Sequence, residues 1–237
     1  MALLGTAALA MWWDMAPALR GEFEAWHTHE HFSERLRVPG FLRASRWASA
    51  EGGEGFFVLY DLADYEVLTS APYRERLNGP TPWSLRMMPH HRNMVRSQCR
   101  VLDSAGGATA GCLATLRLSP RAGRQEALRA ALRPLLTRAA AAPGLAGGHL
   151  LLTDTPRAPQ TAEQRLRGGR DAAADWILLL AAYDLAALQA AATGDFAAPA
   201  LLAAGAADAP VVSLFQLRQT ATTADLPVAP PAVQRGS

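Results

Sequence analysis

The chain of 237 residues is half hydrophobic, and its 23 basic residues, all of them arginine, exceed the 21 acidic residues by only two. A charge this small and this dispersed excludes a nucleic-acid-binding surface. The two cysteines, Cys99 and Cys112, form neither a disulfide framework nor a zinc-binding spacing, which is typical of proteins of the reducing cytoplasm.

The first ten residues are apolar, yet they predict the beginning of a buried strand rather than a secretory signal. No positively charged residue precedes Arg20, whereas a secretory signal begins with a charged region. No apolar run in the chain reaches the roughly 18 residues that a membrane helix needs. We therefore expect a cytoplasmic protein that binds neither membranes nor nucleic acid.

The first half of the chain predicts the order strand, helix, strand, strand, helix, strand. The first helix should end before Pro39-Gly40, because proline disfavours the helical conformation of the residue that precedes it. Asp64 is a suitable cap for the second helix. The expected elements are strand Ala7–Asp14, helix Ala18–Arg37, strands Phe41–Ala48 and Phe56–Tyr60, a helix that carries Tyr65 to Leu77, and strand Asn93–Leu102.

The second half repeats this order. A Pro-Gly-apolar turn at Pro143-Gly144-Leu145 matches Pro39-Gly40-Phe41, and Tyr183-Asp184-Leu185-Ala186 matches Tyr60-Asp61-Leu62-Ala63. Recurrence of both features in the same order indicates an internal duplication. The expected elements are strand Cys112–Leu118, helix Gln125–Ala142, and strands His149–Thr153, Trp176–Leu180 and Val211–Leu217.

The repeated order predicts an α+β fold made of two tandem ferredoxin-like βαββαβ units. Each unit leaves one face of its sheet without helices, and two units can bury these faces against each other as a pseudo-dimeric α+β barrel. We expect a first unit at 1–105 that carries the functional site, a second and mainly structural unit at 106–222, and a disordered tail at 223–237.

One face of the predicted first helix is apolar at its beginning and carries ionisable side chains further along. Projected at about 100° per residue, this face carries, in order, Leu19, Phe23, Trp26, His27, Glu30 and Glu34, with His31 on its flank. His29 and Phe32 project to the opposite side, and we expect them at the surface. Because burial of an unpaired ionisable side chain is costly, the helix either leaves the protein at this end or borders a polar pocket.

Two segments of the first half resemble the EthD-like branch of the dimeric α/β-barrel superfamily, over roughly residues 7 to 103. The first contains Glu24-Ala25-Trp26, Glu30-His31-Phe32, Arg35-Leu36 and Pro39-Gly40-Phe41, with Arg46 in the next strand; the second contains Pro82-Trp83, Met88-Pro89-His90 and Arg92-Asn93-Met94. The wider superfamily includes muconolactone isomerases, cofactor-free monooxygenases, polyketide cyclases, aldoxime dehydratases and haem peroxidases. The resemblance therefore implies a pocket between sheet and helices without fixing the reaction.

The resemblance and the residue types together suggest an acid–base site. His31 would act as base or acid and Glu30 would orient it, while His90 would be a second proton donor or an oxyanion partner. Of the adjacent His90 and His91, alternation along a strand sends one inward, and we expect it to be His90. The substrate-binding residues are expected to be Trp26, His27, Tyr60, Trp83 and Arg92, with Arg92 anchoring the substrate by a forked pair of hydrogen bonds.

The leading hypothesis is a cofactor-independent enzyme, with lyase, isomerase or cyclase chemistry, that acts on a small apolar or aromatic molecule as a monomer or homodimer. One alternative is a haem- or metal-binding protein that uses His31 or a cluster of His27, His31 and His90. His27-x-x-Glu30-His31 spells an inverted zincin motif, but no third ligand stands out, so no metal ligands are assigned. A further alternative is a binding module without catalysis, with solvated loop histidines and aromatic core side chains.

Overall fold

Eight strands form the wall of a barrel in the computed structural model, which describes residues 2–155, 159–169 and 171–226. All neighbouring strands are antiparallel, and their order β1-β3-β2-β8-β5-β7-β6-β4 closes on itself. The strands are β1 (Ala7–Asp14), β2 (Phe41–Ser49), β3 (Gly55–Leu62), β4 (Arg92–Gly106), β5 (Cys112–Leu118), β6 (Leu145–Thr153), β7 (Trp176–Ala182) and β8 (Val211–Thr222).

The closed barrel corrects the predicted fold class. We expected two ferredoxin-like units that pack as a pseudo-dimer, but the sheet is continuous: β2 pairs with β8 and β4 pairs with β6. The prediction is wrong because it considered only the bare faces of the two sheets. An open sheet also has edge strands with unpaired backbone groups, and pairing these edges removes them altogether.

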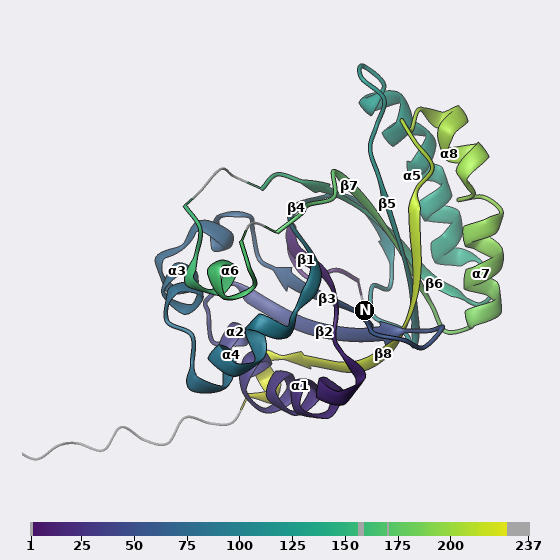
Figure 1. Ribbon diagram of the computed structural model, residues 1–237. Helices are drawn as coiled ribbons and strands as arrows, with labels where there is room; N and C mark the ends of the chain where they lie inside the picture. The colour runs from purple at the N-terminus through teal and green to yellow at the C-terminus, as the bar shows by residue number, and fades with distance from the viewer. Residues whose placement is uncertain (1, 156–158, 170, 227–237) are drawn as a thin grey trace, which may run out of the picture.

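Helices cover the outside of the barrel in two groups (Figure 1). One group surrounds the outer face of β1, β2 and β3, and it includes α6 although this helix comes late in the chain; the other group covers the outer face of the strands of the second half. The first group is α1 (Arg20–Trp26), α2 (Phe32–Leu36), α3 (Ala71–Asn78), α4 (Pro82–Met87) and α6 (Ala162–Leu166), and the second is α5 (Gln125–Ala141), α7 (Leu185–Thr193) and α8 (Ala198–Ala204).

Alternation along each strand divides the side chains between the barrel interior and the helix layers. On β1, for example, Ala8, Ala10 and Trp12 belong to the interior cluster, while Leu9 and Trp13 pack against the first group of helices. This is the period of two that a strand buried on both faces requires. The molecule therefore has one core inside the barrel and one under each group of helices.

The first helix contains a π-helical turn at His27–His31 between α1 and α2. A π turn holds one residue more than an α turn, so the side chains that follow it are rotated about the helix axis. The prediction that Phe32 lies at the surface is wrong for this reason: Phe32 is only 1% exposed. His29, inside the turn, is exposed as predicted.

Most predicted elements are present, with altered ends. The first strand has the predicted bounds, whereas β4 and β8 extend beyond theirs and α8 was not predicted. The predicted helix after Asp64 is divided into a 3-10 turn at Glu66–Thr69 and α3. Of the predicted tail, 227–237 lies outside the described residues, and Thr223–Asp225 forms a 3-10 turn.

No helix within the described ranges is by itself long and apolar enough to cross a membrane. Only α7 and α8 taken together, with a bend of 49° between them, reach that length and composition.

Candidate functional site

Buried ionisable side chains gather between the outer face of the barrel and the helices α1, α2, α3 and α6. They surround a cavity of about 30 Å³, which we call the histidine cavity. Its polar lining residues are His27, His31, Arg35, Tyr60, Tyr73, His91, Arg96, Glu163 and Arg167. So many polar groups in an otherwise apolar layer indicate a site built for more than packing.

His27 and His31 enter the cavity because both belong to the π-helical turn. Their ring centroids are 5.1 Å apart, and the His31 ring packs against the Trp26 indole with a centroid distance of 4.5 Å. Both side chains are almost fully buried, with exposed fractions of 1% and 4%. π turns of this kind occur often at functional sites, since they alter which side chains a helix presents.

His91 is held in a defined orientation and tautomer. Its Nδ1 lies 3.2 Å from the Met87 carbonyl oxygen and 3.3 Å from that of Met88. Carbonyl oxygens only accept hydrogen bonds, so Nδ1 carries the proton and the neutral ring keeps its lone pair on Nε2. The Trp13 indole packs on this ring at a centroid distance of 5.1 Å. His91 is thus a base whose free nitrogen has a fixed position.

All three cavity histidines are neutral near pH 7. Burial lowers the pKa of His91 to about 3, and the positive charge of Arg167 acts in the same direction. Burial likewise lowers the pKa of His27 and of His31 well below the ordinary value; nearby His31 adds to the effect on His27, and Arg35 to that on His31. A neutral imidazole in an apolar site can accept a proton, which a protonated one cannot.

Two cations of the cavity are tied to acidic partners from the second half of the chain, and a third is tied to a tyrosine hydroxyl. Arg35, on α2, donates to the Glu163 carboxylate on α6. Burial alone would lower the pKa of Arg35, but Glu163 together with Tyr73, Tyr60 and Glu34 outweighs it and the pKa is raised. Arg167 donates to Asp171 at 2.7 Å, and Arg96 donates to the Tyr73 hydroxyl at 2.7 Å. These pairs fix positive charge around the neutral histidines.

Five buried polar atoms of residues that line the cavity have no hydrogen-bond partner among the described residues: Trp13 Nε1, His27 Nδ1, His31 Nδ1, Arg35 NH1 and the Tyr60 hydroxyl. The nearest carboxylate oxygen to His31 Nδ1 belongs to Glu34, at 3.7 Å. Buried donors and acceptors are almost always satisfied in folded proteins, by water or ligand where not by protein. Their clustering indicates that a polar group of a ligand, or water, completes the cavity.

A wider recess of about 510 Å³ adjoins the histidine cavity, and we call it the vestibule. His91, Met94 and Arg167 line both spaces. The boundary therefore consists of one flexible thioether side chain, one arginine and the fixed imidazole. Because His91 itself lines the vestibule, a molecule in the vestibule can contact its ring.

The structure brings together only part of the predicted site. His31, His27 and Tyr60 line the histidine cavity, and Trp26 is buried against His31. Glu30 does not face His31: it accepts hydrogen bonds from Trp26 Nε1 at 3.1 Å and from the Thr81 hydroxyl at 2.5 Å.

The other predicted residues lie outside the cavity. His90 is exposed and His91 is the buried one, so the expected orientation of this pair is wrong: a 3-10 turn at Met88–His90 precedes the strand and sets which histidine points inward. Trp83 packs at the edge of the core under the first helices. Arg92 is on the rim of the vestibule and pairs with Glu54.

Sequence reasoning missed His91 and the charged residues Arg35, Arg96, Glu163 and Arg167. The sequence did single out the adjacent histidines His90 and His91, but the prediction had His90 rather than His91 pointing inward. Glu163 and Arg167 follow a polar loop in the second half and carry no local signal, because closure of the barrel places α6 beside α3.

The histidine cluster predicted for a metal ion is not assembled, and the histidine cavity by itself has no room for haem. Within the described ranges, no group of three or more histidine, cysteine or acidic side chains is placed to hold a metal ion, and His90 is exposed. A haem iron lies at the centre of its macrocycle, so a whole porphyrin would have to stand beside the ligating histidine. The cavity of about 30 Å³ is far smaller than the roughly 300–1,000 Å³ of sites for organic ligands, so a macrocycle beside these histidines would have to extend into an adjoining space.

No protein-family model and no curated protein matches the chain. Solved structures do match: an anthrone oxidase-like protein has a TM-score of 0.63 at 14% identity, covering 97% of this chain and 99% of that one. A candidate monooxygenase of Fusobacterium nucleatum subsp. nucleatum has a TM-score of 0.59 at 8% identity, covering 92% and 95%. Another, from Lactobacillus acidophilus, has a TM-score of 0.59 at 10% identity, covering 92% and 97%.

The chain has a dimeric α+β barrel fold. Each of these matches extends over nearly the whole of both chains, so the likeness includes both halves of the barrel and its helices. Identities this low show the fold alone, and the reaction has to be argued from the site. In this dimeric α+β barrel fold the histidine cavity lies between the barrel wall and the helices, where the sequence resemblance led us to expect a pocket.

Proposed function

We propose that this protein is an enzyme that removes a proton from a small, largely apolar or aromatic molecule, with His91 as the base and no organic cofactor. The observation that carries the proposal is the state of His91. Its Nδ1 donates to two backbone carbonyls, which leaves Nε2 free to take a proton; burial lowers the pKa of the ring to about 3, and a substrate anion formed beside it would raise that pKa. The ring is therefore neutral with its lone pair on Nε2, beside the boundary between vestibule and cavity.

The cavity also supplies the groups that an anionic intermediate requires. Removal of a proton from carbon or oxygen leaves negative charge on the substrate, and preorganised donors stabilise such charge best in a dry site. The unpaired Arg35 NH1 and the Tyr60 hydroxyl are such donors. Burial raises the pKa of Tyr60, so the hydroxyl keeps its proton and can donate it in a hydrogen bond.

We assign His31 the role of the second acid–base group. Its Nδ1 has no hydrogen-bond partner in the described part of the chain, and Glu34 lies near enough to stabilise its protonated form. A proton that His91 takes from one atom of the substrate and passes on, directly or through His31, to a different atom gives isomerisation. Loss of a leaving group from the same anion gives a lyase reaction.

The sizes of the two spaces define the kind of substrate. The histidine cavity holds little more than one small group, whereas the vestibule of about 510 Å³ has the volume of an ordinary ligand site. We therefore place the body of the substrate in the vestibule and only its reacting edge against His91. The aromatic rings of Trp13 and Trp26 around His91, at 5.1 and 5.9 Å between centroids, favour an apolar edge.

We also propose that the chain belongs to the EthD-like branch of the superfamily, which the residues of the first helix and its Pro-Gly-Phe turn support. Gly40 has a φ of +92°, and a Cβ atom there would lie 2.2 Å from a Val67 side-chain carbon. This turn thus requires glycine, so the motif has a structural reason to recur.

The test is hydrogen exchange in D2O on substrates whose C–H bond is acidified by a carbonyl group. Anthrone and the smaller 2-tetralone are suitable, and NMR follows loss of the acidic C–H signal. We expect the wild-type protein to accelerate exchange and His91→Gln to abolish the acceleration, typically a loss of about 10²–10⁴-fold for a general base. His90→Gln is the matched control, because His90 is exposed, and it should exchange as the wild type does.

Equal rates for wild type and His91→Gln would refute the assignment of the base. Saturable binding of the ketones without any exchange would favour the alternative of a binding module without catalysis. Oxygen consumption, measured in parallel, shows what becomes of the substrate anion. Uptake of oxygen indicates that dioxygen oxidises the anion, and the absence of uptake indicates isomerase or lyase chemistry.

A further inference from the structure

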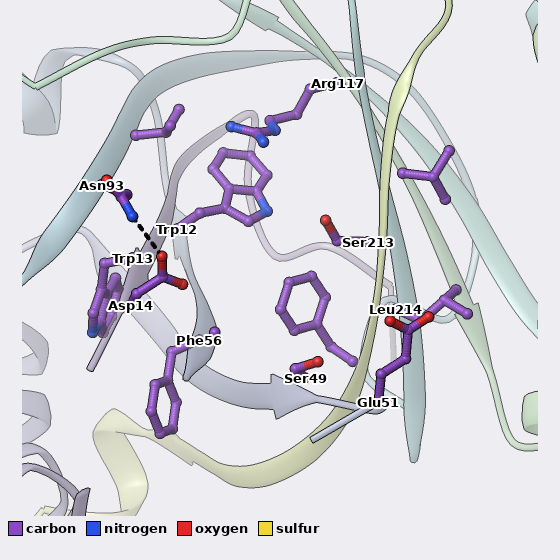
Figure 2. Close-up of a pocket in the computed structure, with 14 residues that line it drawn as sticks. Trp12, Trp13, Asp14, Ser49, Glu51, Phe56, Asn93, Arg117, Ser213 and Leu214 are labelled. Carbon is purple, nitrogen blue, oxygen red and sulfur yellow. Dashed lines mark hydrogen bonds between the residues drawn. The ribbon is translucent and has the colours of Figure 1, made fainter. Parts of the chain in front are cut away.

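The barrel interior contains a second cavity, separate from the histidine cavity. At one end of the barrel the interior is closed by the first residues of the chain: Arg43 donates to the Ala2 carbonyl oxygen at 2.9 Å, and Asp61 accepts from the Leu4 backbone at 3.0 Å. At the other end a cavity of about 600 Å³ opens, drawn in Figure 2. We call it the barrel-mouth cavity. Eight-stranded barrels are wide enough to hold one small ligand in this position.

A single arginine points into the barrel-mouth cavity. Along β5 the interior positions are Leu113, Thr115 and Arg117, because alternate side chains share a face. Figure 2 shows the Arg117 guanidinium directed toward the Trp12 indole, and its central carbon is 5.3 Å from the ring centroid. This is the distance of a cation–π contact.

The Arg117 guanidinium has no anionic partner in the described part of the chain. Its Nε is buried without a hydrogen bond, and no ion pair to a carboxylate is present for it, in contrast to Arg35, Arg92 and Arg167. Arginine stays protonated when buried. A partly buried, unpaired cation in a cavity of ligand size is a ready site for an anion.

The wall beside Arg117 is aromatic and rigid. Trp12 Nε1 donates to the Thr115 hydroxyl at 3.1 Å, which fixes the plane of the indole. Phe57 packs on Trp12 at a centroid distance of 4.8 Å, and Phe215 continues the aromatic wall at 5.7 Å from Phe57. A flat ligand can stack on such a surface without a large loss of side-chain entropy.

Two carboxylates restrict the charge of the ligand. Asp14 and Glu51 line the cavity away from the Arg117 guanidinium, and Asp14 already accepts a hydrogen bond from Asn93 Nδ2 at 2.7 Å. A second negative group on the ligand would meet these carboxylates and be repelled. The arrangement suits one anionic group at Arg117 and an uncharged body.

We propose that the barrel-mouth cavity binds a small planar aromatic monoanion, of the aromatic carboxylate class, with its carboxylate on Arg117 and its ring against Trp12 and Phe215. The site is independent of the proposed reaction at His91. The two cavities share only Trp13 among their lining residues.

The test is isothermal titration calorimetry of the full chain with 2-naphthoate, using 2-naphthamide as the uncharged probe of the same shape. We expect one saturable site for 2-naphthoate and binding of 2-naphthamide weaker by at least about tenfold, the worth of a charge-assisted hydrogen bond. Arg117→Gln should weaken 2-naphthoate by the same factor. Arg121→Gln, an exposed arginine outside the lining, is the matched control and should bind as the wild type does.

A second variant tests the same site in case Arg117→Gln does not fold. Ser213 lines the cavity and is only partly buried, so Ser213→Asp adds a negative charge without removing a core contact and should weaken 2-naphthoate at least about tenfold by repulsion. Equal affinity for the acid and the amide, or no saturable site, would overturn the proposal. So would loss of 2-naphthoate binding in His91→Gln with retention in Arg117→Gln, since this places the ligand in the histidine cavity.

Discussion

Acidification should destabilise the fold through the buried histidines, and His91→Gln isolates one of them. The pKa of His91 is lowered to about 3 from an ordinary value of 6.5, chiefly by burial. Between these values the unfolded chain binds a proton that the folded chain does not, so the free energy of unfolding falls as the pH falls. The stabilising contribution is complete above about pH 6.5 and is lost below it.

The size of this loss of stability follows from the shift in the pKa of His91. Each pH unit below 6.5 costs about 1.36 kcal/mol for one histidine that stays neutral in the fold. At about pH 5 the loss from His91 is therefore about 2 kcal/mol, and no discount for solvent is needed because the residue is only 6% exposed. The pKa values of His27 and His31 shift in the same direction, so the wild type should lose more stability than His91 alone accounts for.

Asp61 acts in the opposite direction, which is why a variant is needed. Burial raises the pKa of Asp61 to about 6 although Arg43 opposes the shift. A carboxyl with a raised pKa binds its proton more tightly in the fold, so it adds stability at low pH and loses it as the pH rises through about 6. Its gain partly masks the histidine loss in the wild type, but it is common to wild type and variant and cancels in their difference.

The assay is urea unfolding of wild type and His91→Gln at about pH 7.5 and about pH 5, with linear extrapolation to water. Glutamine is neutral and can still donate to the Met87 and Met88 carbonyls. The variant should lose about 2 kcal/mol less than the wild type on acidification, and exposed His90→Gln should behave as the wild type. Equal losses in wild type and His91→Gln would refute the burial of a neutral His91.

Three further predictions concern the packing around the site, each measured by urea unfolding at neutral pH. Glu163→Gln leaves the buried Arg35 guanidinium without its carboxylate and should cost about 3 kcal/mol; an unchanged midpoint would contradict the pairing. Gly40→Ala, at a φ of +92°, should cost about 2 kcal/mol or more, and a neutral result would disprove the strained turn. Phe32→Ala should lower the free energy of unfolding by about 3–5 kcal/mol and His29→Ala by under about 0.5 kcal/mol. A larger loss in His29→Ala than in Phe32→Ala would show that the π turn is misplaced.

The local features of the chain were predictable because they depend on neighbouring residues. Apolar patterning defined the first strand at its observed bounds, and Pro39-Gly40 ended the first helix as expected. The ionisable stripe of that helix led to His27 and His31 in a cavity, since helical periodicity decides which side chains share a face.

The features that depend on distant parts of the chain were not predictable in the same way. The prediction for Phe32 assumed an uninterrupted α-helix, and the π turn at His27–His31 is not encoded by any residue type. The choice between His90 and His91 depended on a 3-10 turn that shifts the start of alternation. Glu163 reaches Arg35 only because the barrel closes and brings α6 to the helices of the first half.

The state of His91 is the most direct test of the account. Long-range ¹H–¹⁵N NMR correlation of the histidine rings distinguishes the two neutral tautomers and follows their protonation with pH. The structure predicts that His91 carries its proton on Nδ1 and stays neutral down to about pH 4, since its pKa is about 3. A proton on Nε2 would contradict the role of His91 as a preorganised base, and protonation with a midpoint near the ordinary value of 6.5 would contradict its burial in the neutral form.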